Sequence, residues 1–293
     1  MAAPLSGKRN LCFLRVGDTS THREWMGDPA TRSYDVWLDY YGEGDSSRWR
    51  EDPVHLTDGP GTTKYARAQA LLPELTRYEA VWFPDDDISV DAAGVERLFE
   101  TFHAFRMLLA QPSLADGSYV AHEITRWNGS FVVRFTNFVE AMCPLFSREA
   151  LRACAPSFTQ SVSAFGMDMV WARMLGDPRD RAGMIDAAPV VHTRPIGAGT
   201  WRRPAGFDPP ADRDRILAAY GVPWPFPFRT YGGVSRGEGE GASRVLAGGV
   251  RFLARMAAGA PRSVRWRRRY WSRTLKSVWR GRPGASSARS ERR

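Results

Sequence analysis

The chain has 293 residues, 43% of them hydrophobic and 25% charged, which is ordinary for a soluble globular protein and enough for one large α/β domain or two small ones. Three cysteines in apolar contexts, and no run near the ~20 apolar residues of a membrane-spanning helix, exclude a disulfide framework and a transmembrane segment. The net charge of +9 is uneven: residues 235–293 hold 16 Lys and Arg against 3 Asp and Glu, so this tail carries +13 and the body before it −4. The N-terminus lacks the apolar segment of a signal peptide, so we expect a cytoplasmic protein.

The first half of the chain alternates short apolar runs with amphipathic stretches. Buried strands are expected where β-branched and aromatic residues cluster, and helices where apolar residues recur every three or four positions. The expected elements are strands at Asn10–Val16, Tyr34–Tyr40 and Tyr78–Phe83, a helix at Lys64–Leu75, and a helix capped by Asp91 whose apolar stripe runs to Leu109. A β, β, α, β, α order favours a largely parallel sheet with covering helices.

The second half is less regular. Its expected strands are Tyr119–Thr125 and Phe131–Phe135, joined by a turn at Asn128-Gly129, then Phe138–Phe146 and Met184–Val191; its expected helices begin at Ser147 and span Gly166–Leu175 and Asp212–Tyr220. We therefore expect a single α/β, Rossmann-like domain with a central, mostly parallel mixed sheet at residues 8–231. A Gly-rich linker at Gly232–Gly241 opens a basic C-terminal tail at 232–293.

The tail combines Arg with Trp. Arg244–Met256 is expected to form a short amphipathic helix, and 262–282 interleaves Arg with aromatic residues. Contact with an anionic membrane surface through 244–282, on the inner face, is favoured because Trp271, Leu275 and Trp279 share one helical face. Nucleic-acid binding and a solvated disordered tail are the alternatives.

Three adjacent carboxylates follow the Tyr78–Phe83 strand, at Asp85, Asp86 and Asp87. Ligands bind at the carboxyl ends of strands in open α/β sheets. In an extended chain, Asp85 and Asp87 point one way and Asp86 the other. Two hard oxygen ligands on one side form a partial site for Mg²⁺ or Mn²⁺ that a substrate phosphate completes. The alternatives are a cap for the next helix and a solvated turn, although Asp91 already supplies that cap.

Two further residues lie where an α/β site would gather them. Asp168 opens a helix after Gly166, and His192 directly follows the Met184–Val191 strand. A transferase that moves a sugar from a nucleoside diphosphate needs a divalent cation, ligands for it and, if it inverts configuration, a carboxylate base. Helix capping by Asp168 and a structural role for His192 are equally open.

Five short segments, in this order, resemble the family called domain of unknown function 707: Lys8–Leu11, Trp82–Asp87, Glu123–Arg126, Phe138–Ser147 and Gly166–Asp168. The resemblance covers about residues 8 to 196. That family is similar to glycosyltransferases of the A-type fold. The resemblance implies a DxD element at Asp85–Asp87, a base at Asp168 and a late metal ligand at His192, although the second acidic residue often found beside the base is Met167 here.

Other polar residues are candidates for binding substrate or cofactor. Glu123 and Arg126 are expected to bind substrate or to form a cross-strand ion pair, and Glu140, in an apolar run, to face the acceptor. The nucleotide and its diphosphate are expected to meet a second set: Arg15, Asp18, Lys64, Arg67, Asp85 and Asp86. A solvated helix face is the favoured alternative for Lys64 and Arg67.

These observations predict a glycosyltransferase that uses Mn²⁺ or Mg²⁺ and moves a sugar from a nucleotide-sugar donor to a hydroxyl on a glycan or lipid-linked acceptor. The metal ligands would be Asp85, Asp87 and His192, and the catalytic residue Asp168. A catalytically silent glycan- or nucleotide-binding domain of the same fold, and a nucleic-acid-binding protein acting through its tail, are the alternatives.

Overall fold

The computed structural model of the chain describes residues 6–42, 44–50, 55–59, 62–195 and 206–236. Its strands are β1 (Asn10–Val16), β2 (Tyr34–Tyr40), β3 (His55–Asp58), β4 (Ala80–Trp82), β5 (Ile88–Ser89), β6 (Leu109–Leu114), β7 (Phe131–Thr136), β8 (Leu145–Ser147), β9 (Ala182–His192) and β10 (Thr230–Ser235). Its α-helices are α1 (Lys64–Ala70), α2 (Leu72–Leu75), α3 (Ala92–Ala104), α4 (Arg148–Cys154), α5 (Met167–Met174) and α6 (Pro209–Ala219). Short 3₁₀ helices are η1 (His22–Glu24), η2 (Ser46–Trp49), η3 (Glu123–Thr125) and η4 (Ala155–Ser157).

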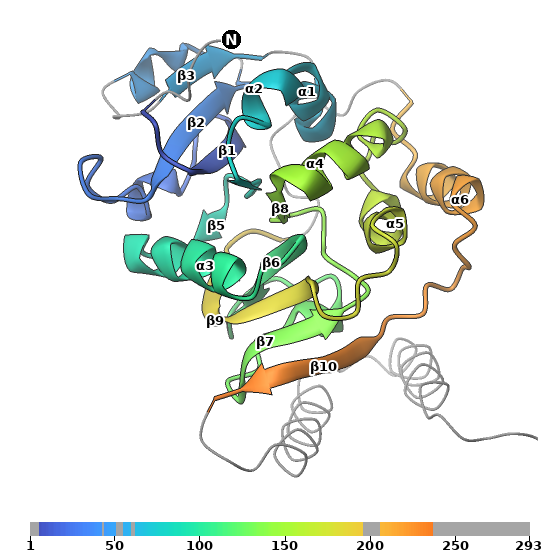
Figure 1. Cartoon of the computed structure of the whole chain (residues 1–293). Helices are drawn as coiled ribbons and strands as arrows, with labels where there is room; N and C mark the ends of the chain where they lie inside the picture. Colours follow the sequence, from blue (N-terminus) through green and yellow to red (C-terminus); the bar gives the residue numbers. More distant parts are fainter. Residues whose placement is uncertain (1–5, 43, 51–54, 60–61, 196–205, 237–293) are drawn as a thin grey trace, which may run out of the picture.

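All described strands join one sheet, in the order β10-β7-β9-β6-β8-β4-β1-β2-β3, with β5 paired to β9 beside it (Figure 1). The pairs β1–β2, β1–β4, β2–β3 and β6–β9 are parallel. Following the antiparallel pairs from strand to strand, only β7 and β8 on this path run against the others. The sheet is therefore mixed and mostly parallel, which confirms the predicted fold class.

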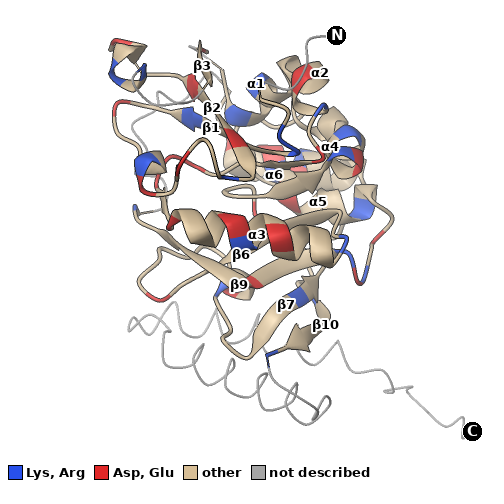
Figure 2. Ribbon diagram, turned by 60° about the vertical axis from the view of Figure 1, so that its left-hand side comes forward, with Lys and Arg blue, Asp and Glu red and all other residues tan. Residues whose placement is uncertain are grey.

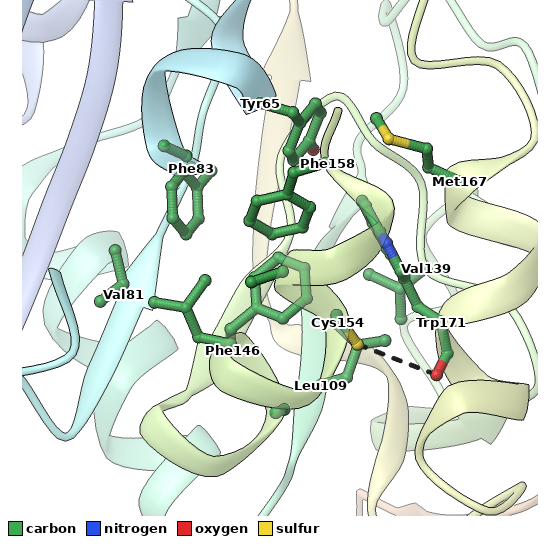
Figure 3. Packing of buried hydrophobic residues seen from close by; sticks show 14 of the residues in the cluster. Tyr65, Val81, Phe83, Leu109, Val139, Phe146, Cys154, Phe158, Met167 and Trp171 are labelled. Carbon is green, nitrogen blue, oxygen red and sulfur yellow. Dashed lines mark hydrogen bonds between the residues drawn. The ribbon is translucent and has the colours of Figure 1, made fainter. Parts of the chain in front are cut away.

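Two apolar cores cover the two faces of the sheet. Alternation along β1 sends Leu11 and Phe13 into one core and Cys12 and Leu14 into the other. The first core lies under α1, α2, α4, α5 and α6, and Figure 3 shows its aromatic centre, where Phe146, Phe158 and Trp171 pack against one another. The second core lies under α3 and the 3₁₀ helices η1 and η2. The result is a three-layer α/β/α arrangement.

Most expected elements of the first half are present, but strands β3, β5 and β6 were not predicted and two helices differ from the expectation. The expected helix at 64–75 is broken at Leu71 into α1 and α2, because Pro73 has no amide hydrogen for a continuous helix. The stripe predicted to reach Leu109 stops earlier: α3 ends at Ala104, the chain turns at Arg106 (φ 48°), and Leu109 begins strand β6. That strand was missed because its sequence contains Pro112 and does not alternate.

The second half corrects three further expectations. No strand forms at Tyr119–Thr125 and hence no hairpin at Asn128-Gly129, because the carbonyl of His122 accepts bonds from Thr125 N and Oγ1 and closes the turn η3. Only Leu145–Ser147 of the run expected at Phe138–Phe146 joins the ladder, although Phe138 and Val139 are buried. Strand β10 passes through Gly232 to Ser235, so the expected linker does not begin at Gly232.

Acidic and basic residues are interspersed over the described domain, and α3 carries both signs on its outer face (Figure 2). Within the described residues, no helix is long and apolar enough to cross a membrane. The predicted amphipathic helix at Arg244–Met256 and the Arg/Trp segment at 262–282 lie outside the described residues, and membrane contact through them stays a prediction.

Candidate active site

Several polar loops meet at the carboxyl edge of the sheet. Strands β1, β2, β4 and β9 run in the same direction, so the residues that follow them share one edge. Gly17 follows β1, Tyr41 follows β2, the Asp85–Asp87 triplet follows β4, and Thr193-Arg194 follow β9. The fold therefore gathers the candidate residues around the triplet, as the sequence predicted for Asp87 and His192.

The short strand β5 brings Asp87 and His192 together. Ile88 pairs with His192 in an antiparallel ladder, so Asp87 lies opposite Thr193. Both the amide and the hydroxyl of Thr193 donate to the Asp87 carbonyl, at 3.0 and 2.9 Å. On the other side, Thr21 donates its amide to the Asp86 carbonyl at 3.0 Å. The triplet is thus fixed between the β1 loop and β9.

His192 faces Asp87 closely enough for a proton or a cation to be shared between them. Its Nδ1 lies 2.7 Å from the carbonyl oxygen of Tyr119, which can only accept, so Nδ1 carries a proton. The other nitrogen, Nε2, lies 3.3 Å from Asp87 Oδ2. In neutral His192 this would set a lone pair against a carboxylate. Burial opposes charge on the ring, but the hydrogen bonds to Asp87 and Tyr119 outweigh it and raise the pKa of His192.

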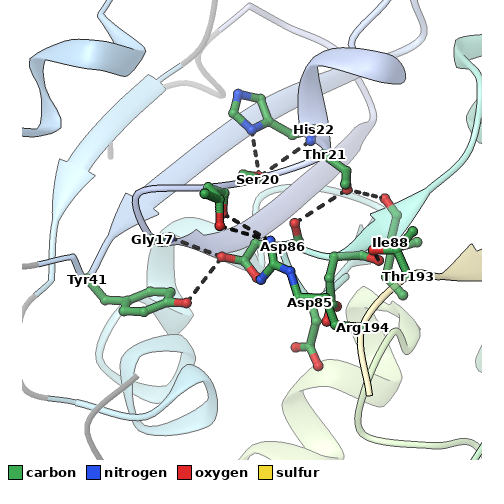
Figure 4. A network of polar contacts seen from close by, with 12 residues as sticks. Gly17, Ser20, Thr21, His22, Tyr41, Asp85, Asp86, Ile88, Thr193 and Arg194 are labelled. Atoms are coloured by element: carbon green, nitrogen blue, oxygen red, sulfur yellow. Dashed lines mark hydrogen bonds and ion pairs between the residues drawn. The ribbon is translucent and has the colours of Figure 1, made fainter. Parts of the chain in front are cut away.

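Asp86 points into a separate network of hydrogen bonds (Figure 4). Its Oδ2 accepts from the Gly17 amide and the Tyr41 hydroxyl, both at 3.1 Å, and its Oδ1 accepts from Arg194 at 3.0 Å. Burial raises the pKa of Asp86 to about 6, against the Gly17 hydrogen bond and the charge of Arg194. These bonds hold three loops together, so Asp86 is a positioning residue in this geometry, and its predicted contact with the cofactor has no direct support here.

Asp85 forms an ion pair with Lys64. The Lys64 ammonium donates to Asp85 Oδ1 at 2.6 Å and to the carbonyls of Met142 at 2.9 Å and Phe83 at 3.2 Å. Only 14% of the Lys64 side chain is exposed, so the favoured alternative of a solvated helix face is wrong for this residue. The Asp85 side chain is 44% exposed, which leaves it open to a ligand.

Asp168 and Glu140 are buried carboxylates with unsatisfied oxygens. Asp168 lies in the first turn of α5, where the Ala141 amide donates to Oδ2 at 3.4 Å and Oδ1 has no partner. Burial raises the pKa of Asp168 to about 7, although nearby backbone N–H groups, including that of Gly166, lower it. The Glu140 Oε2 also has no partner, and burial, reinforced by repulsion from Asp168, raises its pKa to about 8. These two carboxylates therefore interact, and each retains a free acceptor.

Arg15 and Arg67 are both bound to Asp39, which the sequence analysis did not single out. Asp39 is the penultimate residue of β2 and has no exposed surface, and its carboxylate lies 3.2 Å from Arg15 Nε and 2.8 Å from Arg67 Nε. Thr57 donates to it at 2.7 Å, and Arg15 also donates to the carbonyls of Gly59 and Thr62. This network joins β1, β2, β3 and α1 through Asp39. The position of Asp39 at a strand end, like that of the triplet, was the available signal.

The remaining candidates lie at the margin or elsewhere. Asp18, at the end of β1, accepts a bond from the Tyr40 hydroxyl at 2.6 Å and is about half exposed. Glu123 and Arg126 form an ion pair at 2.5 Å within the single turn η3, which replaces the expected cross-strand pair. In the part of the chain that the structure describes, no contact joins this pair to Asp87, Asp168 or His192, so substrate binding by Glu123 and Arg126 stays a prediction.

A divalent cation fits between Asp87 and His192 as far as their donor atoms are concerned. Asp87 Oδ1 is buried without a partner, and His192 Nε2 presents a lone pair once its proton is lost. Within the described ranges, no three His, Cys, Asp or Glu side chains converge closely enough to hold a metal ion by themselves. Two protein ligands with phosphate and water completing the shell are the usual arrangement for Mg²⁺.

Comparison with known proteins gives a family match and distant structural likenesses. The curated proteins gave no match. Crystal structures of S. aureus TarS align over 72% of this chain: residues 1–349 in complex with UDP-GlcNAc (TM-score 0.48, 11% identity), residues 1–349 alone (0.45, 12%) and residues 1–349 in complex with UDP (0.41, 11%). This chain spans 65% of the first structure and 70% of the other two. Residues 133–203, which include Glu140, Asp168 and His192, match the model of the family described as protein of unknown function (DUF707), so the resemblance predicted from the sequence is confirmed over that segment.

Proposed function

We propose that this protein is a metal-dependent glycosyltransferase of the A-type fold that moves a sugar from a nucleoside diphosphate sugar to an acceptor hydroxyl. The observation that carries the proposal is the opposition of His192 Nε2 and Asp87 Oδ2 at 3.3 Å, with Nδ1 already committed to a carbonyl. Such a pair is stabilised by a cation between its members. Asp85, 44% exposed and two residues before Asp87, is paired with Lys64, so it would adjoin this site without completing a three-residue ligand set.

The cation, when bound, supplies positive charge that stabilises the departing diphosphate. In the transfer, the bond between the anomeric carbon and the diphosphate oxygen breaks with its electron pair going to the diphosphate. A bond forms from that carbon to the acceptor oxygen, and the acceptor proton goes to Asp168. A pKa of about 7 suits Asp168 to this role, because a general base works best when its pKa lies near the working pH.

Glu140 assists as a neutral acid in this scheme. With a pKa of about 8 it is mostly protonated at pH 7, so it adds no second charge beside Asp168 and can donate a hydrogen bond to the acceptor or to Asp168. Lys64, held by Asp85, keeps a positive charge at the entrance for the diphosphate. The glycan or lipid-linked nature of the acceptor, and membrane contact through the tail, stay predictions. A liposome assay comparing the full chain with a form ending at Arg236, which retains β10, tests that contact.

A thermal-shift panel of ADP, CDP, GDP and UDP, each with and without MnCl₂, tests the function. A nucleotide at 100 times its dissociation constant adds about 2.7 kcal/mol, or a rise of roughly 5–10 °C in the melting temperature. We expect this shift only with Mn²⁺, and we expect Asp87→Asn to abolish it.

Asp91→Asn is the matched control. It makes the same substitution four residues away, at the exposed N-cap of α3, and an Asn side chain can also accept the capping hydrogen bond. Stabilisation by a nucleotide that needs no metal and survives Asp87→Asn would indicate the silent binding domain instead. Binding to nucleic acid that is steeply salt-dependent and lost with the tail would support the third candidate.

A further inference from the structure

The described part of the chain exposes three large aromatic side chains, and each is tied to the candidate site by a contact or by its place in the sequence. Tyr119, Phe165 and Trp224 are 46%, 51% and 46% exposed, and Val234 is the remaining large hydrophobic residue of this kind. Single exposed apolar residues are common on protein surfaces, so the position of these rings, more than their exposure, indicates a role.

Phe165 is held in solvent by a constrained loop. It precedes Gly166 and lies three residues before Asp168, the proposed base. Buried Asp212 fixes the loop by accepting from the Ser163 amide at 2.9 Å and its hydroxyl at 2.7 Å. Between Ser163 and Phe165, Ala164 adopts a left-handed conformation (φ 66°), which is unfavourable for a residue that has a Cβ. A strained, anchored backbone that displays an apolar ring is typical of a binding site.

Trp224 is linked to the Phe165 loop through Arg213. The Arg213 guanidinium lies 3.9 Å from the centre of the Trp224 ring, and the Arg213 backbone packs so closely on Gly166 that an added Cβ there would lie 2.9 Å from Arg213 Cα. Tyr119 contacts the predicted metal ligand His192, with its ring edge-on and 6.5 Å between centroids.

We propose that Phe165 and Trp224, together with Tyr119, form the acceptor subsite and that the acceptor is a carbohydrate whose C–H faces stack on these rings. This inference rests on the proposed function, because it places the acceptor hydroxyl at Asp168. The rings stand singly among polar groups, with Arg213 under Trp224 and His192 beside Tyr119. A sugar offers that mixture of apolar faces and hydroxyls, whereas a protein or membrane partner requires a contiguous apolar patch of several hundred Å².

Binding of the full-length protein to an array of defined oligosaccharides tests the subsite. Phe165→Ala and Trp224→Ala should each weaken binding about fivefold, since one aromatic contact is lost. Val234→Ala, an exposed apolar truncation on β10, should leave binding unchanged. The thermal shift with nucleotide and Mn²⁺ should persist in all three variants, so a failure of donor binding is seen separately from a failure of the subsite.

Three results would overturn the proposal. One is that the wild-type chain binds no oligosaccharide on the array. Another is that Phe165→Ala and Trp224→Ala bind as tightly as Val234→Ala. The third is that these two substitutions reduce association with anionic liposomes and leave oligosaccharide binding intact, which would assign the rings to a membrane.

Discussion

Replacing Asp168 with Asn should stabilise the folded protein at alkaline pH while it abolishes transfer. The Asp168 carboxylate is buried, and its Oδ1 has no hydrogen-bond partner. Asn has nearly the same shape and carries no charge. A residue kept for stability would not show this combination, because its replacement by a neutral isostere would weaken the fold at every pH.

The magnitude follows from the pKa of Asp168, which burial raises from 3.8 to about 7. Between these values the folded state holds the proton more tightly than the unfolded state, so the free energy of unfolding falls as the pH rises. The fall is about 1.4 kcal/mol per pH unit and reaches roughly 4 kcal/mol above pH 7. The Asn variant avoids this loss of stability, but it also lacks hydrogen bonds from backbone N–H groups and the favourable charge at the α5 N-terminus. We therefore expect its free energy of unfolding to exceed that of the wild type by about 2 kcal/mol at pH 8.

Urea unfolding of wild type and Asp168→Asn at pH 4.5 and pH 8, with metal removed by chelator, measures the difference. The variant should be the more stable protein at pH 8 and lose that advantage at pH 4.5, where wild-type Asp168 is mostly protonated. Donor turnover with Mn²⁺ should fall by at least about 100-fold, the usual effect of removing a general base. If the variant is less stable by the same amount at both pH values, Asp168 caps α5 and the reasoning about its burial fails.

Three further changes probe the surrounding structure. Mn²⁺ affinity, measured by calorimetry in the presence of UDP, should fall about tenfold for each pH unit below the raised pKa of His192, because only the neutral ring can bind metal. An affinity that does not change from pH 8 to 6 would exclude His192 as a ligand. Asp86→Ala should weaken Mn²⁺ binding about tenfold by releasing Gly17, Tyr41 and Arg194, and Asp86→Asn, which keeps an acceptor, should weaken it less; equal, full loss in both would instead make Asp86 a direct ligand. Gly183→Ala should cost more than about 3 kcal/mol in urea unfolding, since its Cβ would lie 2.0 Å from the Arg134 carbonyl oxygen between β9 and β7, and a smaller loss would mean that the two strands can separate.

Local patterns predicted the parts of the site that depend on local geometry. The run before the triplet is apolar, so strand β4 and its carboxyl end could be placed. The extended chain assumed for the triplet does not form, because Asp86 and Asp87 lie in a turn in which the Ile88 amide donates to the Asp85 carbonyl at 3.3 Å. The approach of His192 to Asp87 was also foreseen, because both follow strands. The two-residue strand β5, which sets their register, is too short to produce a pattern of its own.

Other parts of the site depend on contacts between distant segments, and no local pattern encodes them. Asp39 is recognisable only once Arg15 from β1 and Arg67 from α1 are known to meet it. Glu140 comes next to Asp168 through an irregular segment whose apolar residues are buried without strand pairing, which is also why a strand was predicted there. The ion pair of Glu123 and Arg126 was expected between strands because the composition of Tyr119–Thr125 suits a strand as well as the closed turn that forms there.

The three unpartnered carboxylate oxygens of Asp87, Glu140 and Asp168 are the strongest argument that this edge of the sheet binds something. A buried acceptor without a donor costs about 1–3 kcal/mol, and more if the group is charged. Asp86, which adjoins Asp87 in the chain and is equally buried, receives donors from three loops, so the fold is able to satisfy a carboxylate here. The proposed function accounts for the three that stay open, because a cation and hydroxyl donors from a substrate would satisfy these oxygens.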